Sequence, residues 1–361
     1  MEILRLAGPP GVGKSTVAWT LAQHAAETGI PVAYLDIDQL GMCYPAADDD
    51  PDRWRLKERA LRRLARKFAA AGAERLIVSG VASPDAPPPA SEFPTWSLWL
   101  NAPETVLGAR LATRGWTSER VAEVASIGAS ESSRADPSWT RLETGERAPH
   151  QTVADVLRAL DASPPLHAAA PFFTPESADQ HRSDSGPFRV LWLCGPRVAG
   201  TSSVGWAVAT EAWSKEYRTG FIDAAQLSFV WNIDRPVGAC HAQELAHVFR
   251  DAGAQSVVIV APLLVDPRAV RQTLASDGFG WVRIRADEDA RRERIRHRRQ
   301  GRGPVLPGDD LVAAPESVLE SVLAEGSTQL GMPLRDGEAL LDTSCLTVLE
   351  AASRVQAVAE S

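Results

Sequence analysis

The chain has 361 residues, which is longer than one hydrophobic core usually supports, so its length predicts two domains. Hydrophobic residues make up 44% and charged residues 23%, and no apolar run approaches the roughly 18 residues of a membrane span. The net charge of -8 offers no basic surface for DNA or RNA. These properties argue against a membrane protein and against a nucleic-acid-binding protein.

The amino-terminal residues and the cysteines bear on the cellular compartment. The first residues form an apolar strand and a glycine loop, without the basic segment and cleavage site of a signal peptide, so we expect a cytoplasmic protein. The four cysteines lie far apart, which fits neither a zinc site nor a disulfide framework. We expect all of them to be packing residues: Cys43, Cys194, Cys240 and Cys345.

Short apolar strands alternate with helical patterns along the first half of the chain. Strands are predicted at 3–8, 32–36, 75–80 and 97–101, and helices at Ser15–Thr28, Asp52–Ala71 and Glu104–Arg114. Asp50 is expected to be the N-cap of the second helix, with Pro51 at its first position. The alternation predicts a parallel sheet covered by helices, a three-layer α/β sandwich.

A phosphate-binding loop follows the first predicted strand. The segment GPPGVGKST, residues 8–16, matches G-x-x-x-x-G-K-[ST] and precedes a predicted helix. Its glycines let backbone N–H groups turn toward an anion, and the helix adds the positive end of its dipole. Lys14 supplies a positive charge for the β- and γ-phosphates of ATP. The residues expected to bind the nucleotide are Gly8, Gly11, Val12, Gly13, Lys14, Ser15 and Thr16.

Acidic residues close the second predicted strand rather than the third. The third strand ends in Ser79 and Gly80, where motor ATPases and GTPases usually have an Asp that holds Mg²⁺, and no N-K-x-D guanine signature is present. Asp36 and Asp38 lie two residues apart, so on a strand they would project to the same side, toward the loop. The carboxyl ends of parallel strands are where ligands of such sheets bind.

These motifs together resemble a family of small-molecule kinases. A G-x-x-x-x-G-K-S loop, a D-x-D-Q at the second strand, a glycine in the third strand and an R-x-x-x-R helix make residues 1–160 similar to the shikimate, gluconate and adenylylsulfate kinase group. The whole chain also resembles tandem ATP-binding proteins of actinobacteria, which share the stretch DIDQLGMCYP at 36–45. The resemblance implies phosphoryl-transfer chemistry with ATP and Mg²⁺ and leaves the acceptor unnamed.

The kinase resemblance also implies roles for individual residues. Ser15 and Asp36 would hold Mg²⁺, Asp38 would face the acceptor hydroxyl, and Arg110 and Arg114 would be lid arginines that close on the transferred phosphoryl group. Other interpretations remain open, since either Asp could cap a strand-to-loop turn and the arginines could belong to a solvated helix face. Charged residues after the second strand are either acceptor-binding groups or plain surface: Arg53, Arg55, Lys57 and Arg59.

The second half of the sequence repeats the first. A shift of 187 positions superimposes Leu6, Gly8, Pro9, Gly13, Ser15, Val17, Trp19, Asp36, Gln39 and Leu40 on identical residues. Further along, 68–81 corresponds to 249–262, and 98–114 corresponds to 282–298. We therefore expect two tandem P-loop domains, 1–165 and 188–361, joined by a linker at 166–187 that is rich in Pro, Ser and Ala.

The second copy has lost chemical groups that the first copy keeps. Its loop, GPRVAGTSS at 195–203, has Thr201 in place of the lysine, and Ala225 stands opposite Asp38. We expect a degenerate domain that cradles an anion weakly but transfers no phosphate. Its arginine-rich segment 291–302 either captures phosphate or is a solvated basic helix. The end of the chain, 341–359, is matched with 150–160, which lacks its Asp-Thr pair.

Two functions are compatible with this pattern. The first is an ATP-dependent kinase for a small hydroxylated metabolite, with a catalytic first domain and a structural or regulatory second domain. The alternative is a nucleotide-binding switch that acts through a partner protein. In either case the expected partners exclude nucleic acid and membranes, and the protein is expected to be a monomer with an internal pseudo-dimer or a homodimer.

Overall fold

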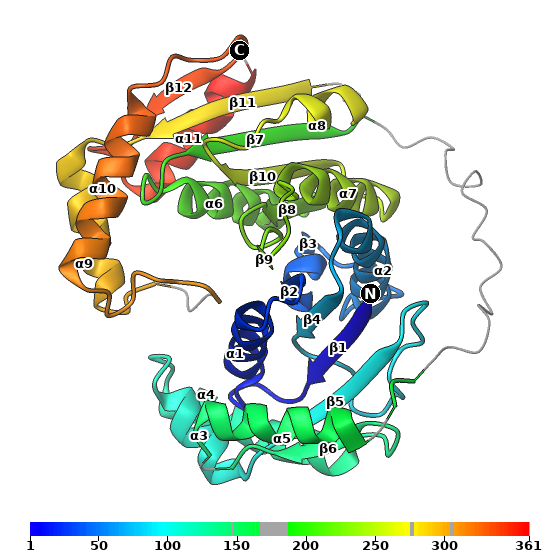
Figure 1. The fold of residues 1–361 in the computed structure, drawn as a ribbon. Coiled ribbons are helices and arrows are strands. Elements are labelled where there is room, and N and C mark those ends of the chain that lie inside the picture. The colour runs from blue at the N-terminus through cyan, green and yellow to red at the C-terminus, as the bar shows by residue number, and fades with distance from the viewer. Residues whose placement is uncertain (146, 163, 167–186, 275–277, 304–306, 361) are drawn as a thin grey trace. The chain divides into compact units, whose positions relative to one another are not determined.

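The computed structural model describes the chain apart from residues 146, 163, 167–186, 275–277, 304–306 and 361 (Figure 1). The predicted linker at 166–187 lies almost wholly outside the described residues. The chain forms two compact units, each built on a six-stranded sheet. Two short segments join the unit opposite to their own half of the sequence: 42–56 belongs to the second unit and Phe229–Arg235 to the first.

The first unit contains a parallel sheet between layers of helices. Its strand order is β6 (Thr140–Glu143), β5 (Thr95–Asn101), β1 (Glu2–Ala7), β4 (Arg75–Ser79) and β2 (Val32–Asp36), and the short antiparallel strand β9 (Val230–Trp231) completes the sheet. The helices are α1 (Lys14–Glu27), α2 (Trp54–Ala71), α3 (Glu104–Ala112), α4 (Ser118–Arg134) and α5 (Pro149–Ala162). Alternate residues of β1 face opposite layers: Leu4 and Leu6 join the core with α1 and α5, while Ile3 and Arg5 face α2.

The second unit repeats this arrangement. Its strand order is β12 (Ala339–Asp342), β11 (Gly278–Arg285), β7 (Arg189–Gly195), β10 (Ser256–Pro262) and β8 (Thr219–Asp223), followed by the short antiparallel strand β3 (Cys43–Tyr44). The helices are α6 (Thr201–Ser214), α7 (Gly238–Asp251), α8 (Arg268–Thr273), α9 (Glu288–Arg299), α10 (Glu316–Leu330) and α11 (Val348–Glu360). Both units have the P-loop α/β fold, as predicted, with the glycine loop between the central strand and the first helix.

The segments that change units are fixed by hydrogen bonds and aromatic contacts. In the first unit, Tyr34 N donates to Phe229 O at 2.9 Å, and the ring of Trp19 lies 4.9 Å from Phe229 and 5.2 Å from Trp231. In the second unit, Phe221 N donates to Met42 O at 2.7 Å. Two-residue strands carry no hydropathy pattern, so this exchange cannot be predicted from the sequence.

Two smaller expectations need correction. Helix α2 begins at Trp54 rather than Asp52, because Arg53 has a φ of 59°, outside the helical region. The Asp50 carboxylate still caps the first turn, accepting hydrogen bonds from Arg55 N at 3.2 Å and Leu56 N at 3.0 Å. Cys43 and Cys194 are buried as expected, whereas Cys240 and Cys345 are exposed and were wrongly assigned to packing. A separate question is whether any segment could cross a membrane. Among the described helices, none is both long and apolar enough to do so.

Candidate phosphate-binding site

The loop of the first unit depends on backbone conformations that only glycine adopts easily. Gly8, Gly11 and Gly13 have φ values of 140°, 83° and 99°. A Cβ on Gly8 would lie 2.4 Å from the carbonyl oxygen of Leu100, so β5 also excludes any side chain there. Gly13 directly precedes α1, whose first amides have no acceptor within the helix. The loop therefore has the shape and the free donors that a bound phosphate needs.

Lys14 lies over this loop. Its Nζ donates hydrogen bonds to Gly8 O at 2.8 Å and to Pro9 O at 2.9 Å. Burial lowers the pKa of Lys14 to about 8, although the nearby carboxylates of Asp38 and Asp36 act in the opposite direction. The ammonium is thus held in the ring of the loop, close to both aspartates.

The two aspartates come together through a turn rather than along a strand. Strand β2 ends at Asp36, and the chain continues as a 3-10 helix, η1 (Ile37–Gly41), that contains Asp38. The expectation that both residues lie on one strand is therefore wrong. Asp38 N donates to Asp36 Oδ1 at 2.9 Å, which is the turn-capping interaction considered as an alternative. Burial, followed by the charge of Asp38, raises the pKa of Asp36 to about 6.

Lys57 on α2 reaches the same site. Its Nζ lies 3.0 Å from Asp38 Oδ1, and the residue is only 5% exposed. A Cβ on Gly41 would lie 2.6 Å from Lys57 Cε, so this glycine leaves room for the lysine stem. The structure separates Lys57 from its neighbours in the sequence: Arg53 stacks on Tyr44 with Cζ 4.1 Å from the ring centroid, and Arg55 pairs with Asp49 at the surface.

Strand β4 ends without an acidic residue. Ser79 Oγ and Tyr34 Oη form a buried hydrogen bond of 2.8 Å. Gly80 has a φ of 144°, and a Cβ there would lie 2.3 Å from Ile37 Cγ2. Gly80 is thus required for η1 to pack against the strand end, which brings Asp36 next to the loop.

The two arginines of α3 make different contacts. Arg110 Nη1 donates to Val12 O at 3.0 Å, and its Nη2 donates to Gly145 O at 2.6 Å. Arg110 therefore braces the backbone of the loop, which differs from the lid role expected for it. Arg114 is exposed, lies 5.6 Å from the ring of Trp116, and its charge contributes to the lowered pKa of Lys14. Of these two arginines, Arg114 is the one whose charge acts on Lys14.

Two residues that act on the loop belong to no motif in the sequence and were not predicted. Thr144, just after β6, donates from Oγ1 to Val12 O at 3.1 Å, beside Arg110. Glu131 on α4 is half-buried; burial raises its pKa, and the charge of Lys14 lowers it in turn. The helix approaches the loop closely, since a Cβ on Gly128 would lie 2.8 Å from Pro9 Cβ. An alignment that matched 142–144 with 341–343 would have identified Thr144.

The donor set fits Mg²⁺ bound together with a nucleotide. No group of three or more His, Cys, Asp or Glu side chains among the described residues could hold a metal ion alone. Mg²⁺ usually takes one or two protein ligands and completes its shell with phosphate oxygens and water. Ser15 at the start of α1 and the half-buried Asp36 carboxylate fit that pattern, since Asp36 needs a cation to stabilise its charge.

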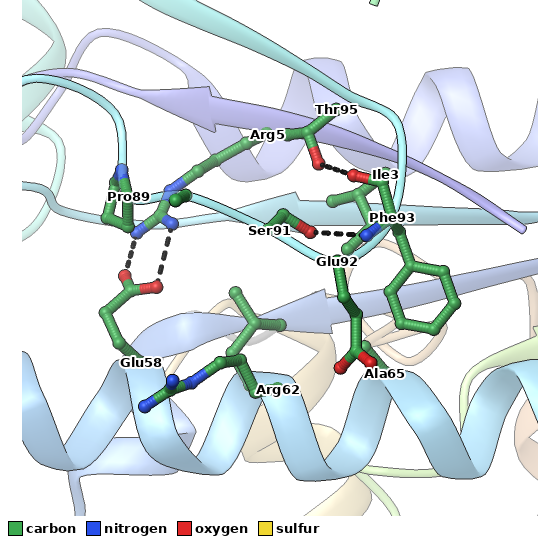
Figure 2. Close-up of a pocket in the computed structure, with 12 residues that line it drawn as sticks. Ile3, Arg5, Glu58, Arg62, Ala65, Pro89, Ser91, Glu92, Phe93 and Thr95 are labelled. Carbon is green, nitrogen blue, oxygen red and sulfur yellow. Dashed lines mark hydrogen bonds and ion pairs between the residues drawn. The ribbon is translucent and has the colours of Figure 1, made fainter. Parts of the chain in front are cut away.

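The two cavities found elsewhere in the first unit do not contain the loop. Figure 2 shows the smaller one, where Arg5 on β1 forms a paired hydrogen bond with Glu58 on α2. Its volume is about 20 Å³, enough for about one water molecule. The larger, of about 380 Å³, is an open groove between α3 and α4 that includes Gly108, Trp116 and Val121.

Comparisons with known proteins found a match to one family model and to several solved structures. Residues 5–134 match a family model described as an AAA domain, a stretch that includes the loop and both aspartates. Among solved structures, a sugar kinase from Janibacter sp. is 18% identical and covers 44% of this chain and 94% of its own, with a TM-score of 0.30. A gluconokinase from Sinorhizobium meliloti 1021 is 19% identical, with coverages of 45% and 92% and a TM-score of 0.31. Shikimate kinase from Aquifex aeolicus is 20% identical, with coverages of 45% and 97% and a TM-score of 0.23. No curated protein matches the chain.

Proposed function

We propose that the first unit is an ATP-dependent kinase that transfers the γ-phosphoryl group to a hydroxyl of a small metabolite. The observation that carries this proposal is the meeting of Lys14, Asp36 and Asp38 beside one glycine loop. A nucleotide-binding loop needs only the lysine and the backbone amides. A second carboxylate beside the metal-binding one, held by its own lysine, is what proton removal from an acceptor hydroxyl requires.

In the proposed complex, each group has a separate task. The loop amides and Lys14 bind the phosphates, with the ammonium exchanging its contacts to Gly8 O and Pro9 O for phosphate oxygens. Arg110 and Thr144 keep the loop rigid through Val12 O. Arg114 provides a second positive charge near the transferred group. Most of the rate enhancement in such a site comes from positioning and charge stabilisation.

The chemical step forms one bond and breaks one. The acceptor oxygen attacks the γ-phosphorus, the bond from this phosphorus to the β–γ bridging oxygen breaks, and ADP leaves. Asp38 orients the acceptor hydroxyl and takes its proton, and the ion pair with Lys57 at 3.0 Å keeps the carboxylate in place. The geometry favours this division of roles because Asp38 is the more exposed of the two carboxylates and carries the lysine partner.

Ser15 and Asp36 would hold Mg²⁺ in this arrangement. Mg²⁺ held by these two residues would neutralise negative charge on the phosphates. Asp36 is suited to a metal because its own surroundings disfavour its charged form. Asp38 stays available for the acceptor because Lys57 already compensates it.

The experiment that tests this proposal is ADP release measured against a library of small hydroxylated metabolites, with Mg-ATP and the full chain. A kinase gives ADP release that depends on one class of acceptor and yields its phosphate ester. Slow hydrolysis that no acceptor accelerates, together with a nucleotide-dependent change in shape, contradicts the kinase and supports a nucleotide-binding switch. The matched Lys14→Ala protein reports the background of each assay.

A further inference from the structure

The second unit keeps the shape of a phosphate loop after losing its lysine. Val198 and Gly200 have φ values of 59° and 96°, matching 83° at Gly11 and 99° at Gly13. A left-handed conformation is unfavourable for a β-branched residue such as Val198. The backbone has nevertheless kept the curl that turns its amides inward, and α6, with 14 residues, begins at the end of the loop.

The side chains that brace the first loop have counterparts around the second. Arg294 on α9 donates from Nη1 to Ala199 O at 2.5 Å, as Arg110 does to Val12 O. Thr343 Oγ1 donates to the same carbonyl at 3.2 Å, as Thr144 does in the first unit. The arginine-rich segment 291–302 thus supplies a loop-bracing guanidinium, in addition to surface ion pairs such as that between Arg292 and Glu320.

A buried hydroxyl points into this second loop. Thr201, at the lysine position, is 9% exposed, and its Oγ1 has no hydrogen-bond partner among the described residues. The oxygen is directed back across the loop, since a Cβ on Gly195 would lie 2.7 Å from it. Leaving a buried hydroxyl without a partner is unfavourable, and an acceptor group bound at the loop would satisfy it.

The position that would hold a metal is already closed. Ser202 and Asp223 correspond to Ser15 and Asp36, and here Ser202 Oγ donates directly to Asp223 Oδ2 at 3.2 Å. The other carboxylate oxygen, Oδ1, accepts from Ala225 N at 3.0 Å. Because the loop has no lysine and Ser202 is bonded to Asp223, it lacks both the cation and the metal site that a triphosphate needs. Its remaining donors suit a single anionic group.

We propose that the loop from Gly195 to Ser203 binds a single phosphate group, as inorganic phosphate or a phosphomonoester, without Mg²⁺ and without transferring it. The donors are the inward amides of the loop, the first-turn amides of α6 and the Thr201 hydroxyl. The proposal does not depend on the kinase activity of the first unit.

The test uses the full chain with Lys14→Ala, which weakens the first loop, and EDTA to remove divalent metal. Titration calorimetry and ³¹P NMR measure the binding of inorganic phosphate, glycerol phosphate and ATP. We expect inorganic phosphate or glycerol phosphate to bind, and the tighter of the two identifies the kind of ligand that the loop holds. ATP should bind no more tightly than these ligands, despite its additional phosphates. No binding at millimolar concentrations, or preferential binding of ATP, overturns the proposal.

Two further variants separate this site from residual binding at the first loop. Added to Lys14→Ala, Thr201→Val should weaken phosphate binding about 10-fold or more, the size expected for a hydrogen bond to a charged group. The control Thr328→Val removes an exposed hydroxyl on α10 and should change nothing. Equal phosphate affinity with and without Thr201→Val overturns the proposal.

The second variant, Thr201→Lys, restores the lysine and keeps the test decisive if the valine protein fails to fold. In the Lys14→Ala background it should strengthen the binding of phosphate, with a stoichiometry of one per chain, because the ammonium adds a positive charge beside the loop amides. A folded Thr201→Lys protein that binds neither phosphate nor ATP shows that the loop cannot hold an anion, and the proposal fails.

Discussion

The two glycine loops of this protein have nearly the same backbone but different chemical groups. Both have positive-φ residues at two corresponding positions, Gly11 with Val198 and Gly13 with Gly200, whereas the positive φ of Gly8 is not repeated at Gly195. Both loops precede a 14-residue helix, and both are braced by an arginine and a threonine on one carbonyl. The first has Lys14 and a pair of carboxylates, whereas the second has Thr201 and a serine bonded to its aspartate. The shape of a phosphate loop can therefore persist after the groups for phosphoryl transfer are gone.

The first way to test this contrast is to remove the lysine. Lys14→Ala should lower ATP turnover by about 10³-fold, because the phosphates lose the one ammonium in the ring of the loop. Steady-state ADP release by the purified variant measures the effect. Thr201→Val at the corresponding position should leave turnover unchanged. Full activity in the Lys14→Ala protein would show that nucleotide binds elsewhere.

Removing the second carboxylate should have the next largest effect. Asp38→Asn keeps the shape of the side chain but cannot take a proton, so kcat should fall by about 10²-fold or more while KM for ATP stays the same. Because Asp223 plays no part in the reaction, Asp223→Asn serves as the control. If kcat is unchanged, Asp38 serves only the turn that its backbone amide forms with Asp36.

Removing Lys57, which holds the Asp38 carboxylate, should lower kcat by a smaller factor. Lys57→Met fills the same buried space but leaves Asp38 without its ion pair, so we expect kcat to fall about 10-fold with KM for ATP unchanged. Lys57→Arg should restore part of the loss. A rise in KM for the acceptor with kcat unchanged would instead make Lys57 an acceptor-binding residue.

The buried negative charge of Asp36 should lower the free energy of unfolding. Burial raises the pKa of Asp36 from its ordinary value of 3.8 to about 6 in the folded protein. Between these pH values the folded state keeps a proton that the unfolded state has lost, so stability falls as the pH rises through this range. Asp36→Asn should therefore raise the free energy of unfolding at pH 7.5 by about 1–2 kcal/mol, allowing for partial exposure.

The pH dependence checks the cause of this gain. Urea unfolding repeated toward pH 4 should show the difference between Asp36→Asn and the parent protein shrinking, as the parent carboxyl becomes protonated. Asp223→Asn should give a gain of the same sign, because burial also raises the pKa of Asp223. A gain that does not change with pH would point to packing rather than charge.

The smallest expected effect concerns the backbone of the second loop. Val198→Gly should stabilise the second unit by about 1 kcal/mol, because glycine relieves the left-handed conformation that valine now adopts. Calorimetry should show a rise of about 2–4 °C in the transition of that unit. Gly11→Val, the reverse change, should destabilise the first unit, since its Cβ would lie 3.0 Å from Leu111 Cγ. No change in either variant would mean that the loops adjust freely.

The sequence predicted the features that depend on local spacing. The glycines and Lys14 of the first loop have fixed positions between a strand and a helix, so the motif identified them and the fold class without any contact information. The match of 98–114 with 282–298 also aligned Arg110 with Arg294, and both contact a loop carbonyl in the structure.

Features that depend on tertiary contacts could not be predicted in the same way. The contacts of Arg110 differ from the expected lid role because they involve backbone carbonyls, which every residue has and no pattern reveals. Lys57 was one of four charged neighbours, and only the packing of its stem against Gly41 distinguishes it. The predicted proximity of Asp38 to Asp36 is correct, but its predicted cause is wrong, because Asp38 lies in a 3-10 helix and not on the strand.

The exchanged segments 42–56 and Phe229–Arg235 limit how the molecule can be divided. A truncated gene ending at the linker would express β2 with a bare edge and leave Trp19 without two of its aromatic neighbours. The complementary fragment would lack the strand that pairs with β8. Each half of the chain thus supplies a strand to the sheet of the other half, so a separately expressed half is expected to be less stable than the same unit in the full chain.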